Sequence, residues 1–140
     1  MIDAWERRHG ASLPLGAHFD GAAGAWNFAL YSKHASGVVL HVYQPGDAVN
    51  PVFSRRLNPL ANKTARVWHC RVGEAELGGG TLYGYRVEGP FDPTRGHRFD
   101  AEKILLDPYA RAVHFPAGYS RAACAGSGSS AGKAPLGVLQ

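Results

Sequence analysis

The sequence lacks any dense cluster of basic residues. Charged residues make up 19% of the 140 residues, and the only adjacent basic pairs are Arg7-Arg8 and Arg55-Arg56. Proteins that bind nucleic acid usually concentrate Lys and Arg in a stripe or patch. The net charge of +4 therefore indicates a mildly basic solvated surface, and no nucleic-acid partner is predicted.

Cysteine, paired histidines and long hydrophobic runs are also scarce. Cys70 and Cys124 show neither the spacing of a disulfide framework nor that of a metal site, and no two of the seven histidines are three or four residues apart. No metal and no cofactor are predicted. Met1–Arg8 lacks the apolar stretch of a signal peptide, so we expect a cytoplasmic location. No run is long enough to cross a membrane, and no membrane contact is expected.

Glycine and proline are abundant instead, with 18 and nine residues, and they separate short runs of alternating polar and apolar residues. Alternation with a period of two puts every second side chain on one face of a strand. Many such strands with frequent turns predict an all-β fold, an immunoglobulin-like antiparallel β-sandwich of about six to eight short strands. The expected strands are 17–19, 24–32, 38–43, 51–58, 66–72, 82–88 and 112–115.

Residues 82–110 carry the most distinctive pattern in the chain. An alternating strand ends at Gly89-Pro90, because proline cannot donate to a strand ladder. Asp100 is a good N-cap, so a short helical turn is predicted over 101–106, and Asp107-Pro108 ends it. The strand, the proline corner, the helical turn and the second proline corner form a recognisable signature.

This signature resembles the N-terminal module of isoamylase-type glycogen debranching enzymes in glycoside hydrolase family 13, a family 48 carbohydrate-binding module. The matching residues are Tyr83-Gly84-Tyr85-Arg86-Val87-Glu88-Gly89-Pro90, Gly96-His97-Arg98-Phe99 and Lys103-Ile104-Leu105-Leu106-Asp107-Pro108-Tyr109-Ala110-Arg111. Pro14-Leu15-Gly16-Ala17, Asn27-Phe28-Ala29-Leu30-Tyr31-Ser32 and Trp68-His69 add weaker matches. The similarity covers about residues 10–115 and implies the same sandwich. Trp26 departs from the family pattern, which more often has a small or β-branched residue there.

The resemblance implies a debranching enzyme that hydrolyses α-1,6 branch linkages in glycogen or limit dextrin by a retaining mechanism in a separate barrel. Such a barrel needs about 250 residues, so we expect this chain to be an inactive fragment without catalytic residues. The expected parts are an N-terminal arm at 1–9, the module at 10–116, and an Ala/Gly/Ser-rich tail at 117–140 that leads toward the absent barrel. A free-standing α-glucan-binding module is the alternative.

Carboxylates that could serve a glycosidase are better explained as structural residues. Glu88, Asp92 and Asp100 are close in sequence, and a glycosidase needs two carboxyl groups roughly 5–9 Å apart across a sugar cleft. Asp92 precedes a proline and Asp100 precedes the expected helical turn, which are positions where aspartate caps a turn. These three residues are therefore not predicted to be catalytic.

Aromatic residues are the candidates for contact with an α-glucan such as glycogen or a maltooligosaccharide. Trp26, Trp68 and Phe91 are considered, because sugar rings stack on exposed aromatic faces. Trp26 and Trp68 share strand faces with other apolar residues, which favours a place in the core, whereas Phe91 lies at a proline corner. The residues expected to meet the catalytic barrel are Phe91, Arg98, Asp107, Tyr109 and Arg111. An isolated module would expose the apolar patch that contacts the barrel.

Overall fold

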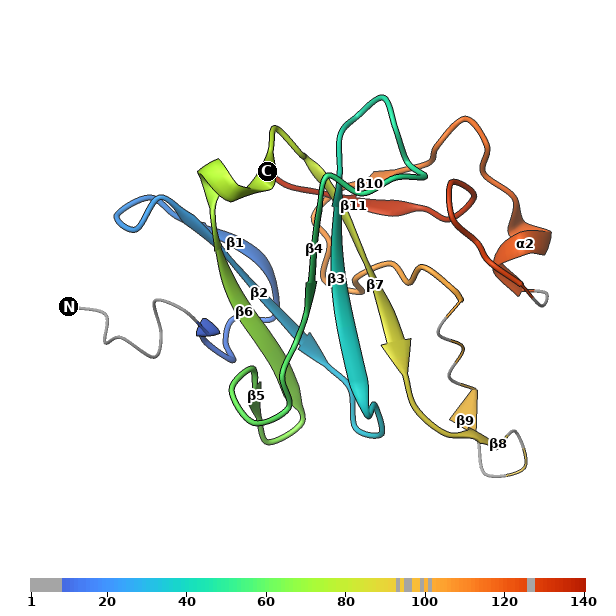
Figure 1. Ribbon diagram of the computed structural model, residues 1–140, viewed down its shortest axis with the longest axis horizontal. Helices are drawn as coiled ribbons and strands as arrows, with labels where there is room; N and C mark the ends of the chain where they lie inside the picture. The colour runs from blue at the N-terminus through green and yellow to red at the C-terminus, as the bar shows by residue number, and fades with distance from the viewer. Residues whose placement is uncertain (1–8, 93, 95–96, 99, 101, 126–127) are drawn as a thin grey trace.

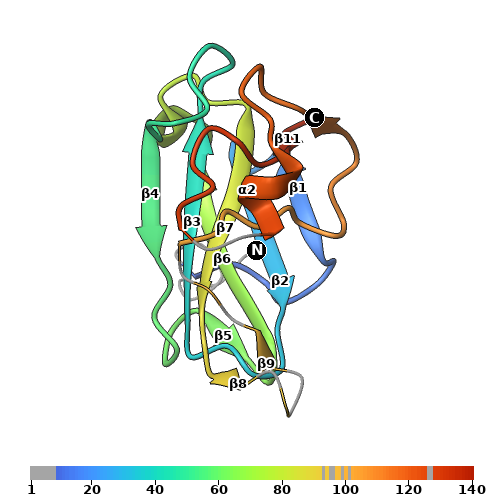
Figure 2. The ribbon, with the colours of Figure 1, turned by 90° about the vertical axis from the view of Figure 1, so that its right-hand side faces the viewer.

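Two antiparallel sheets face each other in the computed structural model, which describes residues 9–92, 94, 97–98, 100, 102–125 and 128–140. Sheet A has the strand order β1-β2-β6-β5, and sheet B has the order β10-β11-β7-β3-β4 (Figures 1 and 2). The strands of sheet A are β1 (Gly16–Asp20), β2 (Ala25–Tyr31), β5 (Lys63–Thr64) and β6 (Val67–Gly73). Those of sheet B are β3 (Gly37–Tyr43), β4 (Phe53–Arg56), β7 (Leu82–Glu88), β10 (Val113–His114) and β11 (Leu136–Val138). The predicted two-layer β-sandwich is confirmed.

Three smaller elements extend from the sandwich. The strands β8 (Phe91–Asp92) and β9 (His97–Arg98) form a separate two-stranded hairpin after the first proline corner. The 3-10 helix η1 (Glu74–Leu77) connects β6 to β7, and the short helix α2 (Arg121–Ala125) lies in the C-terminal part. Among the described residues, no helix has the length and apolar character needed to span a membrane.

The main core lies between the two sheets and follows the alternation of the strands. Every second side chain of β2 and β6 in sheet A points into this core, as does every second side chain of β3 and β7 in sheet B. Its largest fully buried members are Phe28, Trp68, Leu40, Tyr83 and Tyr85. Pairing of Phe28 with Cys70 and of Leu40 with Tyr85 keeps the apolar residues of neighbouring strands on one face.

A second apolar core covers part of the outer face of sheet B. It consists of Tyr43, Leu82, Ile104, Ala134 and Leu136. Gly84 of β7 makes this packing possible, because a Cβ there would lie 2.7 Å from Ile104 Cγ2 and 3.2 Å from Leu136 Cδ2. The covering residues thus come from the segment after β9 and from the C-terminal residues.

Sheet B continues beyond the expected module boundary at residue 116. β11 inserts between β10 and β7, pairing Gly137 with both Val113 and Tyr83. Nor is the segment before β11 an unattached tail. Lys103 is buried, and its ammonium donates to the carbonyl oxygens of Ala123 at 2.7 Å and Gly128 at 2.5 Å. These long-range contacts replace the apolar surface that the segment itself lacks.

The helical turn predicted over 101–106 is wrong for residues 102–106. Asp100 does act as a cap, accepting a hydrogen bond from the backbone N–H of Glu102 at 2.9 Å, but it caps a turn. Leu105 then forms a bridge with Tyr85 through two backbone hydrogen bonds of 2.7 and 3.1 Å. A residue that pairs in this way with β7 has an extended backbone, which ends any helical path.

The outer face of sheet A is covered differently, by a short polar crossing of the N-terminal segment. Asn27 bonds to the backbone N–H and C=O of Ala11, at 2.7 and 3.0 Å, and His69 Nδ1 lies 2.6 Å from the carbonyl oxygen of His9. Residues 9–11 are therefore attached to the sheet. The rest of the predicted N-terminal arm, residues 1–8, lies outside the described part of the chain.

Candidate functional site

The segment Leu105–Arg111 runs along one side of the sandwich, between β7 and the edge strand β1. The Tyr85–Leu105 bridge fixes its start on sheet B. Its other end is tied to sheet A, because Arg111 Nη2 lies 2.7 Å from His18 Nδ1. His18 Nε2 in turn lies 2.9 Å from the carbonyl oxygen of Leu15, an arrangement in which Nε2 donates and Nδ1 accepts the bond from Arg111. The segment therefore connects the two sheets.

Asp107 holds this segment in place from the inside. It is almost completely buried, and its carboxylate accepts hydrogen bonds from the Tyr83 hydroxyl at 2.6 Å and from the Tyr109 N–H at 2.9 Å. Burial, and then the hydrogen bond to Asp107, raise the pKa of Tyr83 far above its ordinary value. Tyr83 consequently remains a neutral donor, and Asp107 acts as a positioning residue that shapes the Asp107-Pro108 corner.

Tyr85 provides the one unusual polar group in this region. Its side chain is 1% exposed, and its hydroxyl has no hydrogen-bond partner among the described residues. Burial, followed by the nearby charge of Asp107, raises the pKa of Tyr85 well above its ordinary value. An unpaired buried hydroxyl costs about 1–3 kcal/mol, so this group favours an arrangement in which a polar atom reaches it.

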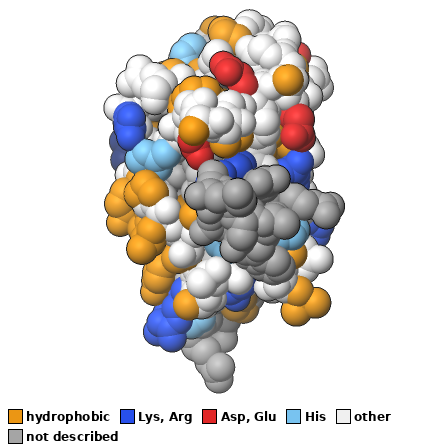
Figure 3. All heavy atoms as spheres, turned by 90° about the vertical axis from the view of Figure 1, so that its left-hand side faces the viewer, with side chains coloured by type: hydrophobic (Ala, Val, Ile, Leu, Met, Phe, Trp, Pro, Cys, Tyr) orange, Lys and Arg blue, Asp and Glu red, His pale blue; other side chains and the backbone are white. Residues whose placement is uncertain are grey.

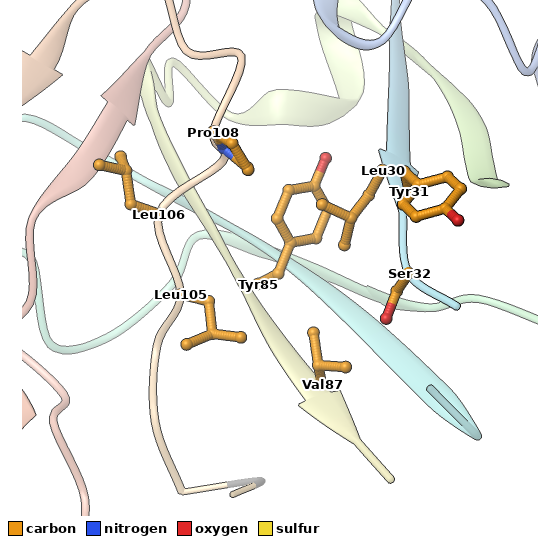
Figure 4. A pocket seen from close by; sticks show the side chains of 8 residues that line it. All are labelled: Leu30, Tyr31, Ser32, Tyr85, Val87, Leu105, Leu106 and Pro108. Carbon is orange, nitrogen blue, oxygen red and sulfur yellow. The ribbon is translucent and has the colours of Figure 1, made fainter. Parts of the chain in front are cut away.

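Two adjoining hollows beside the segment form what we call the side groove. The inner hollow, of about 180 Å³, is lined by Leu30, Tyr31, Ser32, Tyr85, Val87, Leu105, Leu106 and Pro108 (Figure 4). The outer hollow, of about 480 Å³, shares Leu30, Tyr31 and Pro108 with the inner one and adds Leu15 and Tyr109. Nearly all of the lining is apolar, and the orphaned Tyr85 hydroxyl lies at the inner hollow.

The rim of the side groove leaves large apolar side chains in solvent. Tyr31 is 52% exposed, Tyr109 is 57% exposed and Leu105 is 44% exposed. Tyr109 leans against Gly16 of β1, where a Cβ would lie 3.1 Å from the Cβ of Tyr109. Hydrophobic side chains also gather along one border of the face that carries β1 and β6 (Figure 3). An apolar surface of this kind marks a place where another molecule or domain binds.

The residues predicted to meet a catalytic barrel are distributed unevenly around this groove. Tyr109 lines it, Asp107 supports it from below, and Arg111 lies at its β1 end. Phe91 and Arg98 pair through their backbones in the β8–β9 hairpin, but their side chains lie outside the described part of the structure. Of the three whose side chains the structure describes, Tyr109 alone lies in the lining itself.

The two tryptophans proposed for carbohydrate contact lie in the main core. Trp68 is 1% exposed and packs beneath Lys63, whose ammonium is 5.0 Å from the centre of the ring system, so no face of Trp68 is free for a sugar. Trp26 is 9% exposed and packs against Phe19, with ring centres 5.3 Å apart. The sequence already favoured a core position for both tryptophans, because each shares its strand face with other apolar residues.

Among the residues that line the groove, the sequence singled out Tyr109 as a candidate site residue and none of the others, such as Leu15, Leu30, Tyr31 and Leu105. The alternation of β2 placed Tyr31 on the face opposite Leu30, which is a signal that one of them lies outside the core. It did not show that Leu30 and Tyr31 flank the same hollow. Within the described ranges, no three His, Cys, Asp or Glu side chains cluster closely enough to hold a metal ion.

Comparison with known proteins relates this geometry to polysaccharide-degrading enzymes. The chain is 46% identical over 107 residues to the glycogen debranching enzyme of Serratia proteamaculans, covering 76% of this chain and 15% of that protein. It is 43% identical over 109 residues to the chloroplastic isoamylase 3 of rice, Oryza sativa subsp. japonica, covering 74% and 14%. The chain therefore spans about one seventh of the length of the relatives it matches.

Solved structures support the same fold. A product complex of the glycogen-degrading pneumococcal virulence factor SpuA matches with a TM-score of 0.63 and 20% identity, covering 97% of this chain and 13% of that one. A maltotetraose complex of a Paenibacillus barengoltzii pullulanase variant matches with a TM-score of 0.53 and 25% identity, covering 73% and 13%. At this level of identity the likeness to SpuA concerns the fold alone.

A family match identifies the module itself. Residues 14–110, more than half of the chain, match one family from β1 through the Asp107–Tyr109 corner. All of sheet A, strands β3, β4 and β7 of sheet B, the bridge at Leu105 and the groove-forming corner fall within this range, whereas β10 and β11 lie beyond it. The chain belongs to the carbohydrate-binding module 48 family, the isoamylase N-terminal domain.

Proposed function

We propose that this chain is the N-terminal module of an isoamylase-type glycogen debranching enzyme. In this proposal the parent enzyme hydrolyses α-1,6 branch linkages in glycogen or limit dextrin, in the cytoplasm and without a cofactor. The hydrolysis takes place in a barrel of about 250 residues that lies outside this chain. The module supports that barrel, and the chain by itself is inactive. The relatives' names and the short share of their length that the chain covers support this proposal.

The observation that carries the proposed role is the open side groove. Apolar surface costs free energy in water, at roughly 25 cal/mol per Å², so a groove edged by Tyr31, Leu105 and Tyr109 is stabilised when another domain covers it. We assign this groove to the catalytic barrel.

Individual residues then have distinct roles. Tyr109 and Leu105 supply apolar contact area, and Arg111 supplies a charge at the β1 end of the groove. Asp107 does not touch the barrel in this proposal; it keeps Tyr109 in position through the 2.9 Å bond to its N–H. Phe91 and Arg98 remain predicted contacts.

A chimeric enzyme tests the role of the groove. The matched N-terminal residues of the Serratia proteamaculans debranching enzyme are replaced by this chain, and debranching of glycogen and the thermal midpoint are measured. We expect the double variant Leu105→Ser with Tyr109→Ser to lower both. The control is Leu60→Ser, because Leu60 is 87% exposed and does not line the groove. A double variant that behaves like the control would refute the assignment.

The chain alone provides a second test. Assays on pullulan and glycogen should show no turnover, because the proposal places the nucleophile and the general acid in the barrel. Turnover above background by the purified chain, retained through successive purification steps, would contradict this part of the proposal.

A free-standing α-glucan-binding module is the second candidate function. The family description favours it, and so does a hollow of about 230 Å³ at the end of the sandwich, whose lining includes Glu74 and Thr81. Titration of the chain with maltoheptaose distinguishes the two candidates in part. Strong binding by the isolated chain would favour the free-standing module, and absence of binding leaves the supporting module as the better account.

A further inference from the structure

Arg71 of β6 places a charged side chain in an unusual environment on the outer face of sheet A. Its neighbours Cys70 and Val72 belong to the main core, so the alternation of the strand puts Arg71 on the opposite face. The Arg71 side chain is nevertheless only 10% exposed. Its Nε and Nη1 atoms have no hydrogen-bond partner among the described residues, and the Asp20 carboxylate lies 3.5 Å from Nη1. A buried cation is costly unless a carboxylate and hydrogen bonds compensate it.

The described chain begins close to this side chain. The carbonyl oxygen of His9 lies 2.6 Å from His69 Nδ1, and Gly10 lies directly on β6, since a Cβ there would be 2.6 Å from the carbonyl carbon of Cys70. His69 and Arg71 are two residues apart on one face of β6, a separation of about 7 Å along the strand. The eight residues that precede His9 in the sequence therefore join the described chain at the strand that carries Arg71.

The eight N-terminal residues include two carboxylates that could compensate Arg71, Asp3 and Glu6. Glu6 is three residues before His9, and three residues span at most about 10 Å, which is enough to reach Arg71 from the His9 attachment. Asp3 could also reach it, but the entropic cost of closing a loop grows with the number of residues in the loop. Charge and reach together favour Glu6, because Arg7 and Arg8 have the same charge as Arg71.

Small residues occupy the neighbouring positions on the outer face of sheet A. Ala25 pairs with Gly73 on one side of Arg71 along the sheet, and Ala29 pairs with His69 on the other. Side chains this short let a backbone approach the sheet closely, as that of Gly10 already does. The face around Arg71 is therefore shaped to receive an extended segment of chain.

We propose that residues 1–8 fold back over the outer face of sheet A and that the Glu6 carboxylate pairs with Arg71. Glu6 accepts a hydrogen bond from the Arg71 Nε–H, while Asp20 stays beside Nη1. Hydrogen bonds to charged groups are the stronger ones in proteins, so this pair ties the N-terminal segment to β6. Arg71 and Asp20 do not line the side groove, and the proposal is independent of the role assigned to that groove.

Hydrogen exchange of the Arg71 Nε–H, measured by NMR on the 140-residue chain, tests the pair directly. The signal is assigned by its loss in Arg71→Lys. We expect exchange about tenfold faster in Glu6→Gln than in the wild type, because a hydrogen bond between charged groups is lost. Asp3→Asn is the matched control, since it removes the same charge from the same segment, and it should leave the rate unchanged. Equal rates in the wild type and Glu6→Gln, or equal effects of the two variants, would overturn the proposal. So would slow exchange that requires added inorganic phosphate, because an external anion would then be the partner.

Denaturant unfolding of four proteins measures the coupling independently: the wild type, Glu6→Gln, Arg71→Gln and the double variant. Glu6→Gln should lower the unfolding midpoint when Arg71 is present and leave it unchanged in the Arg71→Gln background. An equal shift in both backgrounds would overturn the pair. The exchange measurement compares proteins that all keep Arg71, so it decides the proposal even if Arg71→Gln does not fold.

Discussion

Two apolar surfaces lie outside the main core, and the chain covers one of them and leaves the other open. On the outer face of sheet B, Ile104, Ala134 and Leu136 pack over Tyr43 and Leu82 to make the second core. Beside β7, the side groove keeps Tyr31, Leu105 and Tyr109 in solvent. The two surfaces use similar residue types and even neighbouring ones, since Ile104 is buried and Leu105 is exposed. What differs is whether a segment of the same chain returns to cover them.

This difference suggests that one apolar surface stabilises the module and the other binds a partner. A surface covered by its own chain contributes to the free energy of unfolding of the isolated domain. A surface left open contributes instead to the free energy of binding, when a partner covers it. Substitutions in the second core should lower the stability of the isolated chain, and substitutions in the side groove should change its association.

The largest effect is expected from Leu136→Ala, which removes the covering side chain of the second core. Leu136 is 2% exposed, and truncation of a buried leucine to alanine costs about 2–5 kcal/mol. Denaturant unfolding followed by tryptophan fluorescence measures the loss. Leu60→Ala, at an exposed leucine, is the control. A loss below about 1 kcal/mol for Leu136→Ala would mean that the second core is not well packed.

A smaller loss of unfolding free energy is expected from Asp107→Ala, because Asp107 supports the side groove from inside the sandwich. The Tyr83 hydroxyl and the Tyr109 N–H would each lose their acceptor, and an unsatisfied buried donor costs roughly 1–3 kcal/mol. Tyr83→Phe and the double variant complete a cycle that isolates the Tyr83–Asp107 coupling. Strict additivity of the two single variants would contradict a direct interaction.

On the open side, Tyr31→Ser with Leu105→Ser should change association and leave stability nearly unchanged. The exposed groove predicts that the isolated chain self-associates at high protein concentration. Analytical ultracentrifugation should show a larger average mass for the wild type than for the double variant, with similar denaturation midpoints. A wild-type chain that remains strictly monomeric at high concentration would count against the prediction.

The smallest effect concerns His41, on the part of the outer face of sheet B beyond the second core. Burial, and then the charge of Arg86, lower the pKa of His41. A lowered pKa in the folded state means that the neutral form stabilises the fold. That contribution is present above the ordinary histidine pKa of about 6.5 and is lost as the pH falls through the folded-state value. The wild type should therefore lose slightly more stability than His41→Gln between about pH 8 and about pH 5. Equal pH dependence of the two proteins would contradict this sign.

Much of the sandwich could be predicted from the sequence because its strands repeat a local pattern. The alternation of Trp26, Phe28 and Leu30 against Asn27, Ala29 and Tyr31 was enough to assign faces to β2. The same reasoning placed Trp68 in the core. The candidate site could be predicted from the sequence only in part. Tyr109 belongs to the distinctive motif over residues 82–110, whereas Leu15 and Leu30 lie far from it in sequence and reach the groove through the fold.

The sequence by itself determined the two layers, the strand faces and the family, since each depends on residues that are neighbours along the chain. Only the tertiary structure decided that Leu136–Val138 inserts into sheet B, and that residues 102–106 form a turn and a bridge instead of a helix. It also decided that a groove remains at the side of the sandwich and a hollow at its end. The physical reason is that these features arise from pairings between distant segments. A short stretch such as Leu136–Val138 has too few residues to show a strand pattern, and its position follows from the hydrogen bonds that β7 and β10 offer it.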